Sequence, residues 1–123
     1  MLLLDVTLPL EITNQNDGQG HSFWKKHRQR LQYQSDLRVL GHLRKPFDEP
    51  VRIVATRILG KNQRLWDSSS VLRGSYKQLE DAMVACGWFV DDGPKYITET
   101  VGRQDDTQRS NGPAIRLQVY AVT

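Results

Sequence analysis

Four segments of the chain have the alternating or β-branched pattern that predicts strands. The first spans residues 2–10, and the second, residues 51–59, reads Val-Arg-Ile-Val-Ala-Thr-Arg-Ile-Leu. Two further strands are expected at residues 96–101 and 114–122, joined as a long hairpin by a polar loop over residues 102–112. Because the second segment is the richest in β-branched residues, we expect it in the centre of a sheet.

Two other segments repeat apolar residues at helical spacing. The first helix is expected from Ser22, a candidate N-cap, to about Leu40. Its apolar stripe would consist of Phe23, His27, Leu31, Leu37 and Leu40. The second helix is expected to begin near Ser69, capped by Ser68 or Ser69, and to end at Gly87. Its buried stripe would consist of Leu72, Tyr76, Leu79, Met83 and Cys86.

The resulting order, β-α-β-α-β-β, predicts an α/β fold of the α+β type, in which two helices back a mixed four-stranded sheet. A chain of 123 residues is expected to form one domain, residues 1–123. Asp5 interrupts the apolar start too early for a signal peptide or a membrane span, so we expect a cytoplasmic protein without a membrane partner. The single cysteine, Cys86, excludes an intrachain disulfide and is expected to be buried.

Charge is distributed unevenly along the chain. Residues 1–64 carry 11 Lys/Arg against 6 Asp/Glu, whereas residues 65–123 carry 6 against 8, so the halves are +5 and −2. A basic half suits a polyanionic partner, because each neutralised phosphate releases condensed counterions. A solvated surface that happens to be basic would give the same count.

The densest basic segment lies in the first predicted helix and is interleaved with aromatic residues. Its expected DNA-binding residues are Lys25, Lys26, Arg28 and Arg30. Lys61 and Arg64, in the polar loop after the central strand, are expected to add to this surface. Phe23 and Trp24 would stack on unpaired bases if exposed, or belong to the core if buried, and the sequence leaves both readings open.

Acidic residues flank the second predicted helix. Asp67 precedes it, Lys77 lies on it, and Asp91 and Asp92 follow it. Carboxylates beside a lysine are the groups that hold Mg²⁺ against a phosphodiester, which is nuclease chemistry. Asp-Asp-Gly is also an ordinary turn, and Lys77 with Asp81 is also an ordinary surface ion pair worth about 0.3 to 0.5 kcal/mol.

This segment resembles the RusA-like crossover-junction endodeoxyribonucleases of phages and prophages. In that family an Asp-x-Asp-Asn cluster opens a helix of the form Gly-x-x-Lys-x-x-x-Asp-Ala, and Gly-x-x-x-Asp-Asp follows. The matching residues here are Gly74, Lys77, Asp81, Ala82, Gly87, Asp91 and Asp92. The likeness continues from Leu8-Pro9 through the basic segment to Ala114–Val122, so it covers most of the chain.

The resemblance implies a homodimer that binds branched or four-way DNA. It also implies a Mg²⁺ or Mn²⁺ ion held by Asp67 and Asp92, with Asp91 in support and Lys77 stabilising the charge that develops in the transition state.

One departure from the family concerns the acidic cluster. The resemblance places that cluster on Ser68, Ser69, Ser70 and Val71, so serine stands at both acidic positions. Hydroxyl groups bring no charge to offset dehydration of Mg²⁺. We therefore expect weakened cleavage, with the metal absent if the site is degenerate. The alternatives are an inactive DNA-binding module and a protein-interaction domain of the same fold.

Overall fold

The computed structural model describes residues 1–13, 23–40, 45–67 and 70–122, without the side chain of Phe23. Its elements are β1 (Leu2–Leu8), α1 (Phe23–Val39), β2 (Val51–Ile58), α2 (Tyr76–Ala85), β3 (Ile97–Asp105), a short 3-10 helix η2 (Arg109–Asn111) and β4 (Ala114–Ala121). The predicted order of strands and helices is confirmed. The predicted caps Ser22, Ser68 and Ser69 lie outside the described residues.

The four strands form one mixed sheet in the order β1-β4-β2-β3. β2 runs parallel to β3 and antiparallel to β4, and β1 runs antiparallel to β4. β2 is therefore an interior strand, as its composition predicted. The predicted hairpin is wrong, because β3 and β4 lie on opposite sides of β2. β3 also continues to Asp105, since its backbone pairs with the whole length of β2, and the polar loop is correspondingly shorter.

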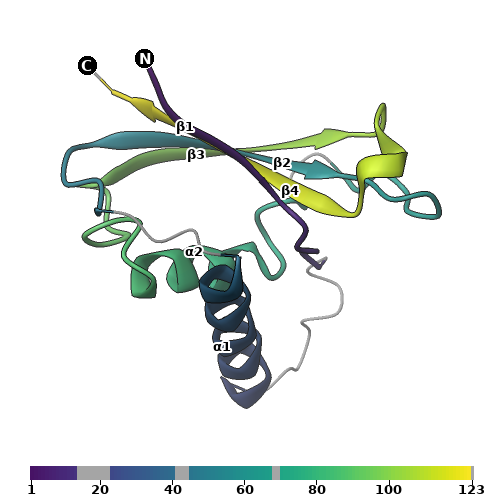
Figure 1. Ribbon diagram of the computed structural model, residues 1–123, viewed down its shortest axis with the longest axis horizontal. Coiled ribbons are helices and arrows are strands. Elements are labelled where there is room, and N and C mark those ends of the chain that lie inside the picture. The colour runs from purple at the N-terminus through teal and green to yellow at the C-terminus, as the bar shows by residue number, and fades with distance from the viewer. Residues whose placement is uncertain (14–22, 41–44, 68–69, 123) are drawn as a thin grey trace.

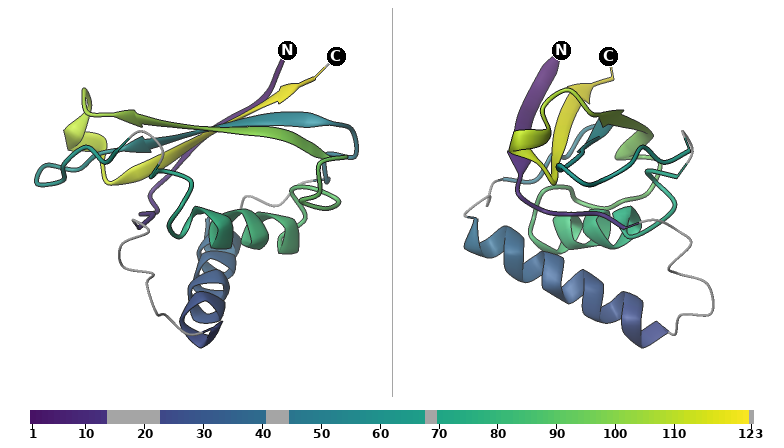
Figure 2. Two further views of the ribbon diagram at one scale, coloured as in Figure 1. Left: turned by 180° about the vertical axis from the view of Figure 1, so that it is seen from behind. Right: turned by 90° about the vertical axis from the view of Figure 1, so that its right-hand side faces the viewer.

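Both helices cover the same face of the sheet, as Figures 1 and 2 show. α2 lies next to the sheet, and α1 crosses beneath α2 as the outermost layer. Alternate residues of β2 and β4 point into the core, where they meet the apolar side of α2. The shared core includes Val51, Ile53, Ala55, Leu79, Ala82, Met83, Ile115, Leu117 and Val119.

The buried side of α1 differs from the predicted stripe. Tyr33 and Leu37 are buried, whereas Leu31 is 46% exposed and Leu40 is 36% exposed. The difference arises because α1 is the outermost layer and needs only a narrow contact face, with residues four apart, to pack on α2. The Tyr33 hydroxyl donates to the carbonyl of Glu11 and shares a hydrogen bond with Ser75 Oγ, each at 2.8 Å.

α2 begins at Tyr76, seven residues later than predicted. Ser75 precedes it, and its side chain does not cap the helix. Instead, Ser75 Oγ accepts the Thr13 N–H at 2.8 Å, and the Ser75 N–H donates to the Thr13 carbonyl at 3.2 Å. Bends and turns occupy residues 70–75, so the helix begins only after them. The predicted stripe is otherwise confirmed, with Leu72 partly buried and the other four residues, Cys86 among them, buried.

The end of α2 agrees with the prediction. Gly87 has φ 85°, a left-handed conformation that favours glycine. The Gly87 N–H donates to Val84 O at 3.0 Å, and the Trp88 N–H donates to Met83 O at 2.9 Å, which together form a Schellman motif. This turn sends the chain back so that Trp88 and Phe89 are buried and Phe47 bridges to Phe89.

We predict that Gly87→Ala lowers the free energy of unfolding by about 1 kcal/mol, because an alanine Cβ is strained at positive φ. Urea denaturation followed by circular dichroism measures the change. Gly87→Asn is the matched control, and its loss should be smaller because asparagine tolerates this conformation. An alanine variant as stable as the original protein would show that the turn can relax without cost.

Candidate functional site

Three carboxylates converge on the amine of Lys77. Its Nζ donates to Asp92 Oδ2 and lies 3.0 Å from Asp81 Oδ1 and 4.0 Å from Glu80 Oε1. Glu80 and Asp81 are three and four residues further along α2, so they share the side of the helix that carries Lys77. Asp92 reaches the same amine because the turn at Gly87 reverses the chain. The helix and the segment after it therefore meet at one charge cluster.

The cluster is held at the surface. The Lys77 side chain is 55% exposed, and those of Asp81 and Asp92 are 31% and 32% exposed. Glu80 is the buried member, at 8% exposure. Glu80 was not among the predicted site residues, although its position three residues after Lys77 on the same helix could have identified it.

The pKa values follow from this geometry. Partial burial opposes the charged form of Lys77, but hydrogen bonds to Asp92 and Asp81 outweigh it and raise the lysine pKa well above its usual range. The Lys77 hydrogen bond lowers the pKa of Asp92. Burial raises the pKa of Glu80, with the positive charge of Lys77 acting in the opposite direction. Lys77 and Asp92 therefore form a charged pair at neutral pH.

The two adjacent aspartates have different surroundings. Asp92 points to Lys77, whereas Asp91 is exposed and its Oδ1 accepts the Asp92 N–H at 2.8 Å. Asp91 thus supports the turn that presents Asp92, which agrees with the interpretation of Asp-Asp-Gly as a turn.

Asp67, the predicted metal ligand before the helix, is exposed on the segment after Trp66, and its carbonyl accepts the Ser70 N–H at 2.9 Å. Ser70 itself is buried. Across the four described ranges, no group of three or more His, Cys, Asp or Glu residues is arranged to hold a metal ion. The Lys77 amine already occupies the position between Asp81 and Asp92. The carboxylates of the described residues therefore do not form a donor set that fits Mg²⁺ in this conformation.

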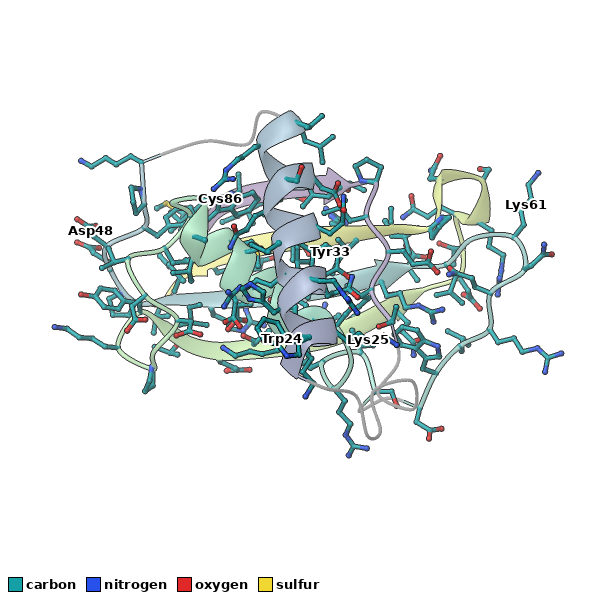
Figure 3. The ribbon with its side chains drawn as sticks, turned by 90° about the horizontal axis from the view of Figure 1, so that it is seen from below. Trp24, Lys25, Tyr33, Asp48, Lys61 and Cys86 are labelled. Atoms are coloured by element: carbon teal, nitrogen blue, oxygen red, sulfur yellow. The ribbon has the colours of Figure 1, made fainter. Side chains whose placement is uncertain are left out.

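The basic segment of α1 is mostly exposed. Trp24 is 66% exposed, and Lys25, Lys26 and Arg28 are exposed beside it. Arg30 differs: it is half-buried, and its guanidinium lies 2.8 Å from His27 Nδ1. The structure therefore resolves the alternative for Trp24, which is a surface residue and not part of the core. In Figure 3 Trp24 and Lys25 lie together on α1, while Lys61 lies at one end of the long axis.

Lys61 and Arg64 are exposed on the loop between β2 and α2. The loop contacts Arg57, which was not among the predicted site residues. Arg57 is only 4% exposed and lies on the helix-covered side of β2, in register with the core residues Ile53 and Ala55. An arginine two residues after Ala55 and four after Ile53, on the otherwise apolar side of the strand, was the signal that could have identified it.

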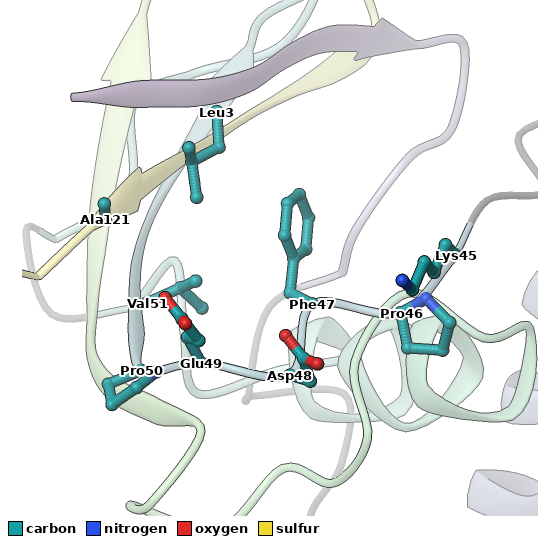
Figure 4. Close-up of a pocket in the computed structure, with 9 residues that line it drawn as sticks. All are labelled: Leu3, Lys45, Pro46, Phe47, Asp48, Glu49, Pro50, Val51 and Ala121. Atoms are coloured by element: carbon teal, nitrogen blue, oxygen red, sulfur yellow. The ribbon is translucent and has the colours of Figure 1, made fainter.

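A hollow of about 230 Å³ lies at the other end of β2 (Figure 4). Its lining residues are Leu3, Lys45, Pro46, Phe47, Asp48, Glu49, Pro50, Val51 and Ala121. None of the predicted site residues lines it, so the hollow and the charge cluster are separate features.

No protein-family model and no curated protein matches this sequence. In the described part of the chain, no helix has the length and apolar character that a membrane span requires.

We predict that Asp92→Asn lowers the free energy of unfolding at neutral pH by about 1 kcal/mol or less, because the pair with Lys77 is partly exposed. A carboxylate whose pKa is lowered by folding stabilises the fold at pH values above its ordinary pKa of 3.8. This contribution is lost as the pH falls through the lower pKa of the folded state. The difference between the original protein and Asp92→Asn should therefore shrink as the pH falls below about 4.

Urea denaturation at several pH values tests this prediction, with Asp91→Asn as the control that removes an equal charge one residue away. Only the difference between proteins is informative, because the pKa values of Asp5 and Asp105 are lowered as well. A pH-independent difference for Asp92→Asn would contradict the assigned ion pair.

Proposed function

We propose that this chain is a RusA-like protein that binds branched DNA as a homodimer, with phosphodiester cleavage weak or lost. The observation that carries the proposal is the exposed tryptophan of α1, Trp24, which lies on the outermost layer of the fold and is followed along the helix by three exposed cations, Lys25, Lys26 and Arg28. The strand and helix order and the return of Asp92 to Lys77 support the RusA-like assignment.

The exposure of Trp24 favours a nucleic-acid partner. A tryptophan that is 66% exposed leaves apolar surface in water, although burial of such surface would stabilise the protein. α1 carries five Lys/Arg residues and one acidic residue, Asp36, so phosphate groups are attracted to the same helix. Stacking of an unpaired base on an aromatic ring contributes about 1 to 3 kcal/mol. A branch point offers both phosphates and incompletely stacked bases.

Cleavage is the weaker part of the RusA-like assignment. Asp92 would have to leave Lys77 before it could bind a metal ion, and the pKa shifts of both groups oppose that separation. The serines expected at the family's acidic positions would add no compensating charge. We therefore propose a binding module as the main activity of this chain.

Trp24→Ala should weaken binding to a four-way junction about tenfold and leave binding to a linear duplex within about twofold, because only the junction offers bases for stacking. Fluorescence anisotropy with labelled DNA measures both affinities. Trp24→Phe is the matched control and should keep most of the junction affinity. An equal loss on both DNA forms would identify Trp24 as a general contact.

A separate variant tests the contribution of the positive charges of α1 to DNA binding. Lys25→Glu/Lys26→Glu/Arg28→Glu should abolish binding to both DNA forms near physiological salt, whereas Lys95→Glu, an exposed change elsewhere, should have little effect. Unchanged affinity of the triple variant would remove α1 from the proposed interface. Sedimentation of the protein with and without a junction tests the proposed dimer.

We further predict little or no nicking of a four-way junction in Mg²⁺ or Mn²⁺ under conditions in which the junction is bound. Denaturing gels of end-labelled strands detect nicking. Efficient metal-dependent nicking that Asp92→Asn abolishes would show that the Lys77 cluster opens to form an active site. Efficient nicking that survives Asp92→Asn would point to a contaminating nuclease or to other residues.

A further inference from the structure

The loop of residues 60–66, which links β2 to the segment before α2, is fixed by a buried guanidinium. The Arg57 guanidinium lies 3.6 Å from the centre of the Trp66 ring, close enough for a stacked cation–π contact. The same group donates to the Arg64 carbonyl at 3.0 Å. Because Arg57 is 4% exposed, the guanidinium that contacts the loop has little freedom to move.

Two further side chains hold the loop. The Gln104 amide pairs with both backbone groups of Trp66: its oxygen accepts the Trp66 N–H and its nitrogen donates to the Trp66 carbonyl, each at 2.9 Å. Arg109 donates to the carbonyls of Gly60 at 2.8 Å and of Gln63 at 2.6 Å. Side chains from β2, β3 and η2 therefore hold both ends of one short loop.

Leu65 is exposed because of these contacts. Trp66 turns inward onto Arg57 and the core, so its neighbour Leu65 faces outward and is 56% exposed. Lys61 and Arg64, which precede it on the same loop, are exposed as well. A mobile loop could fold its leucine back onto the protein, but a loop held at both ends keeps this side chain in solvent. The result is an apolar side chain that projects from a rigid, basic loop.

We propose that Leu65 is an apolar wedge that enters the base stack at a branch point in DNA, while Lys61 and Arg64 contact the flanking phosphates. The inference rests on the proposed function. Proteins that kink or open DNA insert leucine and similar side chains between base steps. The insertion is easiest where a base already lacks a stacking neighbour, as at a branch. A rigid loop suits this role, because little conformational entropy is lost when the wedge binds.

The test compares Leu65→Ala with the original protein on a four-way junction and on a linear duplex of equal length. The junction carries 2-aminopurine next to the branch point, and its fluorescence rises when the base is unstacked. We expect Leu65→Ala to bind the junction about tenfold more weakly, to bind the duplex within about twofold, and to lose the fluorescence rise. Leu65→Met should retain both affinity and signal.

Val122→Ala is the matched control. Val122 is 47% exposed and follows Ala121, which pairs with Val51 at the end of β2 opposite the loop. This variant removes similar apolar surface far from Leu65 and should change neither affinity nor fluorescence.

The outcomes separate the wedge from the proposed function. If the original protein binds the junction and Leu65→Ala matches it in affinity and fluorescence, the wedge is wrong and DNA binding stands. Equal weakening on junction and duplex would also overturn the wedge, because Leu65 would then be a general contact. If the original protein binds neither DNA form, both proposals fail, and an exposed leucine that follows two cations on one loop would instead suit an acidic protein partner.

Discussion

The burial of α2 between the sheet and α1 is the constraint on which the rest of this structure depends. Leu79, Ala82 and Met83 are fully buried, so α2 has almost no freedom to rotate or slide. α1 is attached to the fold through α2 and through the Tyr33 hydroxyl, which bonds to Glu11 and Ser75. Fixing α2 therefore fixes the position of the charge cluster at Lys77 and of the basic helix beneath it.

Lys77 and the basic residues of α1 have different electrostatic surroundings. Lys77 is surrounded by carboxylates, so its field is largely cancelled at short range and it attracts a distant polyanion weakly. Lys25, Lys26 and Arg28 lie exposed on α1, where only one acidic residue shares the helix. The cations of α1 would therefore attract a polyanionic partner more strongly than Lys77 does.

The pattern of residues along the chain predicted helices and strands well where interactions between neighbouring residues determine them. Gly87 ends α2 because a left-handed residue is needed there. β2 is an interior strand, as its run of β-branched residues predicted. Prediction failed where distant groups compete with local ones. The Ser75 hydroxyl accepts the Thr13 N–H and does not cap its own helix. β3 pairs with β2 across a long sequence separation in place of a hairpin with β4.

The features of the candidate site can also be divided into those that the sequence determined and those that tertiary packing determined. The sequence by itself determined that Lys77, Glu80 and Asp81 share one side of a helix, because a 3.6-residue period brings i, i+3 and i+4 together. It also determined which segment is basic. Only the tertiary structure decided that Asp92 returns to Lys77, that Trp24 faces solvent and that Arg57 is buried beneath Trp66. These outcomes depend on how the layers pack, and packing joins residues that no local pattern relates.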